Sequence, residues 1–360
     1  MASKPRSPAA AGKDPGERLS PHYCLMRARP PVKLPPGLSM ARVRLIIITA
    51  SKWMNGSTLT YGFSNGPTIQ KDVVRAAFSE WKALGIGLSF TEVSNVTSAQ
   101  IRIAFDQADG SWSYVGTDCL TIAASRPTMN FGWNLTTGYG HNTALHEIGH
   151  AIGFPHEHQN PIAGIVWDDE AVYTSLGKEP NKWSRDETFQ NILEKIKADD
   201  VQGSKWDPNS VMHYEFEAGM ILKPTKYKNG LKPKGGLSAR DKKWVKSFYP
   251  SLPSGAPAKL ALFQSQPLEL KSGQQANFEF IAPANREYTF RTFGVADTVL
   301  SLSQPVSVKG KPQKPLGMDD DSGHERNAEL KATLKKGERL HVKVRVRYVK
   351  RAGEAALMVW

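Results

Sequence analysis

Histidines gather in one part of the sequence, in a pattern that could hold a metal. Six of the nine fall at positions 141, 146, 150, 156, 158 and 213. His146 and His150 are four residues apart, so a helix would place both imidazoles on one face, with Glu147 beside them. Gly153 can adopt a positive φ and turn the chain back, so that His156 reaches the same metal. Three neutral imidazoles leave one position for water, as in catalytic zinc sites.

The elements around this motif are mixed. We expect a helix with the body ALHEIGHAI (144–152), capped by Asn142 or Thr143 and ended by Gly153. Alternation of apolar residues predicts strands at 59–63, 101–105, 119–123 and 128–131. Helical periodicity predicts a helix over 74–81 that stops at Gly85. A last helix is expected to begin at Ser238, with Asp241 three residues on, and to bury Trp244, Val245 and Phe248. Short alternating runs after residue 257, at 278–281, 288–293, 340–346 and 356–360, predict an all-β sandwich.

These patterns divide the chain into four parts. Residues 1–41 are expected to be a flexible leader or pro-segment, 42–250 the α+β domain with a twisted mixed sheet, 251–257 a linker and 258–360 the β-sandwich domain. The net charge is +13, and the excess of Lys and Arg over Asp and Glu is 7 in residues 1–44, 0 in 45–254 and 6 in 255–360. The neutral middle segment argues against specific nucleic-acid binding. We expect no transmembrane segment, because no apolar run approaches the roughly 18 residues a spanning helix needs.

The motif resembles a known family. HEIGHAIGFPHE (146–157) is similar to the zinc motif of the metzincin metalloproteases, and Phe154 and Glu157 are typical of their astacin branch. Ser210-Val-Met-His-Tyr214 resembles the methionine turn of astacins, with Met212 as the floor of the site and Tyr214 as a displaceable zinc ligand. SYVGTD (113–118), TMNFGW (128–133) and LSARDKKWVKSFYP (237–250) resemble segments of bacterial and fungal astacin-like peptidases.

The resemblance implies a metzincin-type fold and a zinc endopeptidase with one catalytic Zn²⁺. The zinc-bound water would give its proton to Glu147, which returns it to the leaving amine, while Tyr214 helps to stabilise the oxyanion. We interpret His141, His158 and His213 as structural or rim residues, and Glu157 is not expected to be a zinc ligand. A peptide substrate would add as a strand to a sheet edge, for which residues 119–123 are the candidate.

Other functions stay open. The chain could be a binding or adhesion module with a vestigial peptidase fold, or a zinc hydrolase of a non-peptide amide. Residues 258–360 resemble the pre-peptidase C-terminal domains of secreted bacterial proteases. Their acidic turn, Asp319, Asp320 and Asp321, could hold Ca²⁺ or be solvated. We expect a monomer acting on proteins or peptides. The resemblance implies an exported enzyme, although residues 1–20 contain no apolar stretch of signal-peptide length.

The two cysteines, Cys24 and Cys119, allow three interpretations. Cys24 lies in the leader and its thiolate could occupy the water position on zinc, which would keep a zymogen latent until the leader is cut. Alternatively, Cys24 and Cys119 form a disulfide, or both stay free. Animal astacins have two disulfides in this domain, and this chain cannot form them. It also contains no animal-type pro-segment motif with an aspartate aimed at the zinc.

Overall fold

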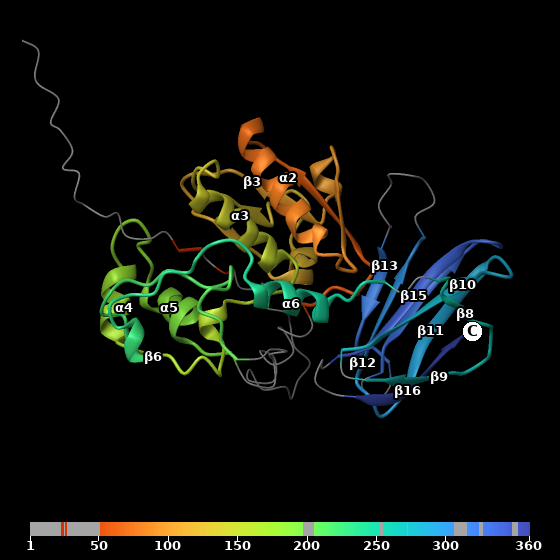
Figure 1. Cartoon of the computed structure of the whole chain (residues 1–360). Coiled ribbons are helices and arrows are strands. Elements are labelled where there is room, and N and C mark those ends of the chain that lie inside the picture. Colours follow the sequence, from red (N-terminus) through yellow and green to blue (C-terminus); the bar gives the residue numbers. More distant parts are fainter. Residues whose placement is uncertain are drawn as a thin grey trace, which may run out of the picture.

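The computed structural model contains an α+β part followed by an all-β part (Figure 1). It describes Tyr23, Cys24 and Met26, and residues 51–196, 205–252, 255–271, 273–305, 315–323, 327–347 and 352–360. The predicted fold class is confirmed. The rest of the leader and the predicted domain start at residue 42 lie outside the described residues, so the four-part division stays a prediction. Hydrophobic cores do lie on either side of residues 250–257.

A five-stranded mixed sheet forms one layer of the first part. Its strands run in the order β2 (Ser89–Glu92), β1 (Thr58–Phe63), β3 (Ile101–Ala104), β5 (Met129–Asn130) and β4 (Trp112–Ser113). Neighbouring strands are parallel except β4, which runs antiparallel to β5 at the edge. The strands predicted at 59–63, 101–105 and 128–131 are confirmed in outline.

The strand predicted at 119–123 is wrong. Gly116–Thr121 form a 3-10 helix, and Gly116 has a φ of 51°. A Cβ at Gly116 would lie 1.7 Å from the carbonyl oxygen of Ser51, which accepts a hydrogen bond from Thr117 N–H at 2.8 Å. This close backbone contact turns the chain where alternation alone predicted extension. The edge strand on this side of the sheet is therefore β4.

Two helices pack together against this sheet. Helix α2 (Thr68–Ala83) buries Val74, Ala77, Phe78 and Trp81 and ends before Gly85, as predicted. Trp81 Nε1 donates to Leu145 O of α3 (Gly138–Ala151) at 3.1 Å. The prediction for the start of α3 is wrong, because Thr137 is its cap and accepts from Gly140 N–H. Gly138 and Gly140 are poor helix formers, so the sequence does not indicate that the first turn of α3 is helical.

A second core lies on the other side of α3. The elements around it are β6 (Val166–Trp167), α4 (Asp169–Leu176), α5 (Arg185–Thr188), a π-helical turn (Phe189–Leu193), β7 (Ile221–Lys223) and 3-10 turns at Glu157–Gln159 and Thr225–Tyr227. A further 3-10 turn, Val96–Ser98, belongs to the sheet layer. Helix α6 (Ala239–Phe248) closes the first part; of its predicted core residues Val245 is buried, whereas Trp244 and Phe248 are half-buried. No described helix is long and apolar enough to cross a membrane.

The all-β part consists of two stacked sheets, seen at the right of Figure 1. One has the order β13 (Pro315–Asp319), β12 (Thr298–Ser303), β15 (Arg339–Val346), β10 (Gln275–Ile281) and β8 (Ala258–Lys259); the other has β14 (Glu329–Leu334), β11 (Arg286–Gly294), β16 (Gly353–Val359) and β9 (Gln266–Leu270). Alternating residues of both sheets enclose one apolar core, which confirms the predicted sandwich.

The acidic turn of the sandwich does not form a calcium site. Arg347 Nη1 lies 3.0 Å from Asp320 Oδ2 and 3.2 Å from Asp321 Oδ2. Asp319 Oδ2 accepts the backbone N–H groups of Ser322 and Glu329. An arginine and two amides thus take the oxygens that a calcium ion would need, and the calcium prediction is not supported.

Candidate metal centre

Four buried side chains from distant parts of the chain converge on one point. Cys24 Sγ lies 3.1 Å from His146 Nε2, 3.6 Å from His150 Nε2 and 3.4 Å from His156 Nε2. Their four ligand atoms lie within 4.8 Å of one another, and no other such group occurs among the described residues. The structure therefore brings together the three predicted histidines, and with them the leader cysteine, in a group that could hold a metal ion.

Helix α3 and the turn after it set the positions of the imidazoles. His146 and His150 share one face of α3, and the carbonyls of its last residues are satisfied from other elements: Trp53 Nε1 donates to Ala151 O and Tyr249 Oη to Ile152 O. Gly153 has a φ of 103°, as predicted. The chain reverses there, which carries His156 back to the helix face.

Backbone carbonyls fix the orientation of two of these rings. His146 Nδ1 lies 2.7 Å from Val211 O, and His150 Nδ1 lies 2.7 Å from Phe154 O. A carbonyl only accepts, so both Nδ1 atoms carry the proton. Burial lowers the pKa of His146 to about 4 and that of His150 well below the ordinary value, so both rings are neutral. Their Nε2 lone pairs therefore point toward the centre.

The donor set fits a zinc ion. His150 Nε2 and His156 Nε2 are 3.0 Å apart, although the first carries no proton. Two nitrogens at this distance can share a proton of His156 or bind a common cation, because no carbonyl fixes the tautomer of His156. Imidazole nitrogens are preferred zinc ligands, and three of them leave a further coordination position that the Cys24 thiol faces here.

Glu147 is buried next to this cluster, with the Cys24 thiol as a polar neighbour of its carboxylate. Its side chain is 0% exposed, and neither carboxylate oxygen has a hydrogen-bond partner among the described residues. Burial raises the pKa of this carboxyl well above its usual range. A fully buried acid with so little polar support is costly to keep, and such groups occur where they handle protons.

The methionine turn (residues 210–214) lies under the cluster and is fixed by α6. Met212 is buried, and a Cβ at Gly149 of α3 would lie 2.3 Å from its sulfur, so only glycine allows this contact. Asp241 Oδ1 accepts the Ser210 hydroxyl at 2.6 Å, and Oδ2 accepts Val211 N–H at 2.8 Å. The turn that supplies the carbonyl for His146 is therefore held by an aspartate thirty residues later.

Tyr214 reaches the cluster from the end of this turn. Its hydroxyl lies 2.5 Å from His156 Nε2 and 3.1 Å from Cys24 Sγ, and donates to Cys24 O at 2.5 Å. The Tyr23 ring packs edge-on against Tyr214, with the two centroids 5.1 Å apart. The leader thus fills the space in front of the histidines.

The remaining candidate residues lie outside the four-residue group. His158 Nε2 contacts Asn191 O, His213 Nδ1 contacts Tyr214 O, and His141 Nε2 lies 3.1 Å from Glu80 at the surface. Glu157 accepts Asp207 N–H at 2.9 Å. Both cysteines are free, so the Cys24–Cys119 disulfide is not present in this structure.

Sequence reasoning missed the residues that orient the site. In the sequence Asp241 is marked only by its place three residues after Ser238, a near match to the capping-box pattern, and the structure contains that box in full. Its second role, as acceptor for Ser210 and Val211, has no local signal, because it depends on two segments meeting in space. The carbonyls of Val211 and Phe154 are equally invisible, since every residue has one.

Comparisons with known proteins agree on one family. The family model of the astacin peptidases matches residues 46–234, more than half of the chain. The solved structure of myroilysin is 33% identical, with 57% of this chain and 98% of that chain covered and a TM-score of 0.53. Protein SpAN of Strongylocentrotus purpuratus is 26% identical over 176 residues, which are 47% of this chain. The chain spans about a quarter of the length of that curated relative.

The sandwich has a weaker match. The pre-peptidase C-terminal domain of a collagenase from Bacillus anthracis is 14% identical, with 30% of this chain and 98% of that chain covered and a TM-score of 0.24. The assignment of residues 258–360 as an all-β sandwich accordingly depends on their own strand pairing.

We expect Asp241→Ala to loosen the methionine turn. It leaves the Ser210 hydroxyl and Val211 N–H buried without their acceptor, which should cost about 3 kcal/mol in the free energy of unfolding. Ser238→Ala is the matched control, because it removes the helix cap but leaves the turn anchored, at a cost of about 1 kcal/mol. Urea unfolding measures both; equal losses would show that Asp241 acts only through the cap.

Proposed function

We propose, because this chain belongs to the astacin family of peptidases, that it is a zinc endopeptidase whose reaction takes place at His146, His150 and His156. The observation that carries the proposal is the Glu147 carboxylate, fully buried beside three converging imidazoles. A metal site that served only structure would have no use for such a carboxylate.

The three histidines would hold the zinc through their Nε2 atoms, with Met212 below them. When bound, zinc acts as a Lewis acid toward the scissile carbonyl and lowers the pKa of water in the site. Val211 O and Phe154 O keep His146 and His150 in the tautomer that coordinates. With the leader in place the whole group is shielded from bulk water. In the leader-free enzyme a bound peptide would provide that shielding and so strengthen the charge interactions there.

We assign proton transfer to Glu147 and oxyanion stabilisation to Tyr214. Glu147 accepts a proton from the attacking water and delivers it to the leaving amine. The Tyr214 hydroxyl, which now contacts His156 and the leader, would donate to the oxyanion of the substrate after the leader leaves. The peptide would lie extended beside β4, the edge strand of the sheet, and pair with it as an added strand.

The two alternative functions fit the site less well. A module that only binds or adheres needs neither a fully buried carboxylate nor three converging imidazoles. A hydrolase of a non-peptide amide would use the same groups, so the substrate has to separate it from a peptidase. Cleavage of casein or of a peptide library distinguishes all three.

We further propose that the leader keeps the enzyme latent through Cys24. Its sulfur faces the position that water would take, and its contacts to all three histidines support this role. Neighbouring residues hold the leader: Tyr23 N–H donates to Asn181 Oδ1 at 3.0 Å and Met26 N–H to Asn191 Oδ1 at 2.9 Å. A zymogen of this kind suits a protease that is exported before it acts, which is the localisation we propose.

Glu147→Gln should keep zinc and lose turnover. Glutamine fills the same volume but cannot accept the proton, so we expect kcat to fall by about 10²-fold to 10⁴-fold in the chain freed of residues 1–41. His150→Ala, as control, should lose zinc and activity together. Metal analysis and peptide cleavage measure both; turnover near the wild-type rate in Glu147→Gln would contradict the assignment.

Tyr214→Phe should fold and bind zinc but hydrolyse peptides more slowly. Loss of one oxyanion donor in a water-poor site should lower kcat by about 10²-fold, with little change in KM. Tyr139→Phe is the control, because it removes a phenol hydroxyl from the lining of the same cleft, in the first turn of α3. An unchanged kcat in Tyr214→Phe would remove this residue from the mechanism.

Cys24→Ala should release latency in the intact chain. Without its thiol the leader loses its hold on the centre, so the intact variant should cleave peptides roughly tenfold faster than the intact wild type. Cys119→Ala removes the other buried thiol, which lies in a different core, and should leave latency unchanged. If the intact wild type is already as active as its leader-free form, the latency proposal is wrong.

A further inference from the structure

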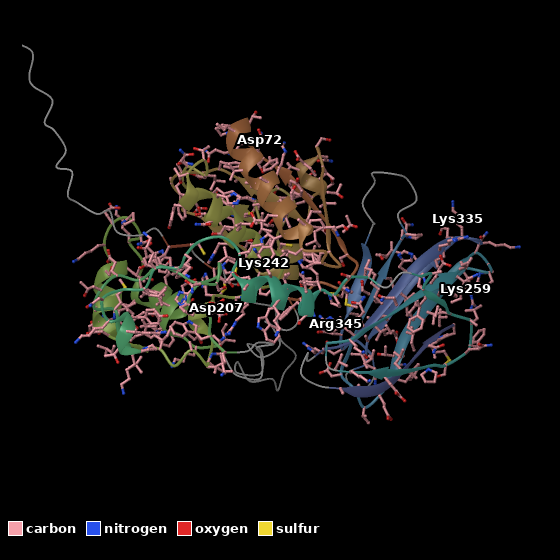
Figure 2. All side chains as sticks on the ribbon, viewed as in Figure 1. Asp72, Asp207, Lys242, Lys259, Lys335 and Arg345 are labelled. Carbon is pink, nitrogen blue, oxygen red and sulfur yellow. The ribbon has the colours of Figure 1, made fainter. Side chains whose placement is uncertain are left out.

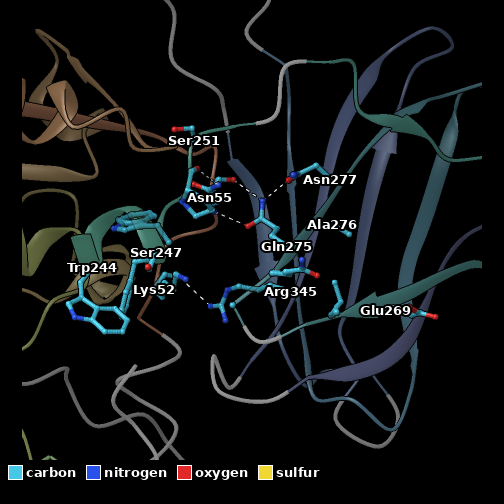
Figure 3. Close-up of a pocket in the computed structure, with 16 residues that line it drawn as sticks. Lys52, Asn55, Trp244, Ser247, Ser251, Glu269, Gln275, Ala276, Asn277 and Arg345 are labelled. Carbon is cyan, nitrogen blue, oxygen red and sulfur yellow. Dashed lines mark hydrogen bonds between the residues drawn. The ribbon is translucent and has the colours of Figure 1, made fainter. Parts of the chain in front are cut away.

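We propose that the cleft between α6 and the sandwich binds an oxyanion, with Lys52 and Arg345 as the groups that hold it. The cleft has a volume of about 670 Å³ and lies away from the histidines. Its walls come from both parts of the chain: Lys52, Asn55 and the end of α6 on one side, and β9, β10 and Arg345 of β15 on the other (Figure 3). Figure 2 places Arg345 at the junction of the two parts.

Both cations are buried and neither forms an ion pair with a described residue, although Asp320 and Asp297 act on Arg345 from a greater distance. Lys52 is 5% exposed and Arg345 is 4% exposed. Arg345 donates only to carbonyls, those of Val346, Arg347 and Lys52, and its Nε has no partner among the described residues. No carboxylate of the described residues lies within ion-pair distance of either group. The neighbouring Arg347, by contrast, is paired with Asp297, Asp320 and Asp321.

Aromatic rings support the lysine but do not neutralise it. Lys52 Nζ lies 4.9 Å from the centroid of Phe248 and 5.4 Å from that of Tyr249. Cation–π contacts of this kind contribute only about 1 kcal/mol, whereas burial of an unpaired charge costs several. Burial and the nearby Arg345 lower the pKa of Lys52 to about 7, which is the response expected of a cation that lacks an anion.

The other acidic and polar side chains that line the cleft do not neutralise Lys52 or Arg345. Glu269 is the carboxylate on the wall; it is exposed and points away from Lys52 and Arg345 (Figure 3). Gln275, the partner of Arg345 in the β10–β15 register, uses its amide to bind Asn55: Asn55 N–H donates to Gln275 Oε1, and Gln275 Nε2 donates to Asn55 O. These contacts join the two walls and leave the two cations facing the cavity.

A phosphate, sulfate or carboxylate group is the ligand chemistry that fits. An oxyanion would accept charge-assisted hydrogen bonds from the Lys52 ammonium and from Arg345 Nη2, which makes one hydrogen bond, to Lys52 O. The cleft is larger than one such ion, so it also has room for a small molecule that carries the oxyanion. A free ion and a phosphorylated sugar are therefore the two sources to compare.

The test measures binding to the intact, zinc-loaded chain by calorimetry. Sodium phosphate, sodium sulfate and glucose 6-phosphate are titrated at constant ionic strength, with sodium chloride as the reference. We expect saturable binding of at least one oxyanion. Tighter binding of glucose 6-phosphate than of phosphate would identify a carried group as the ligand. The absence of saturable binding by all three probes would overturn the proposal.

Variants separate the cleft from general surface charge. Lys52→Met and Arg345→Gln should each weaken binding by about tenfold or more. Lys242→Met, which removes an exposed lysine of α6 (Figure 2), should leave binding unchanged. Loss in all three variants alike would overturn the site. Because Lys52→Met removes a buried unpaired charge, its melting temperature without ligand should not fall, so the comparison does not depend on a damaged fold. Glu147→Gln should bind the oxyanion as the wild type does, whether or not the chain is a peptidase.

Discussion

The convergence of three imidazole acceptors on one point is the constraint on which the rest of the first part depends. His150 Nε2 and His156 Nε2 lie 3.0 Å apart, and groups from several segments of the chain hold the rings in place. The carbonyl of Phe154 fixes His150 from the turn at Gly153, and the carbonyl of Val211 fixes His146 from the methionine turn. A cation bound at this point would tie these segments together, so metal affinity and the stability of the fold should be linked.

The parts of the site that lie close in sequence could be predicted. His146, His150, Gly153 and His156 fall within eleven residues, and helix geometry with one positive φ is enough to relate them. What could not be predicted depends on contacts between distant segments. Asp241 serves the methionine turn only because α6 lies beside it, and the 3-10 helix at Gly116–Thr121 replaces a strand because the Ser51 carbonyl comes close. Local pattern contains no information on such approaches.

The fate of Cys24 shows the same limit. Its spacing from the histidines is more than 120 residues, so the sequence left a metal contact, a disulfide and a free thiol all open. The structure separates the two cysteines into different cores: Cys24 packs with Tyr23 and Tyr214, and Cys119 packs beneath the sheet with residues such as Trp53. A disulfide would have to carry the leader away from the cleft. The edge strand predicted at 119–123 is also wrong because of contacts between distant segments: Gly116–Thr121 form a 3-10 helix, and β4 is the edge strand of the sheet.

Helix α6 connects the metal centre with the cleft to the sandwich. At its start, Asp241 holds the methionine turn, and just beyond its end the Tyr249 hydroxyl donates to Ile152 O at 2.7 Å, next to the turn at Gly153. Tyr249 also accepts Trp53 N–H, and Trp53 and Lys52 belong to the segment that lines the cleft. The same helix therefore helps to position the methionine turn, the turn at Gly153 and one wall of the cleft. Residues of α6 line the cleft, so a ligand between Lys52 and Arg345 would lie next to this helix. The sandwich forms the other wall of the cleft, opposite the helix that supports the candidate metal centre.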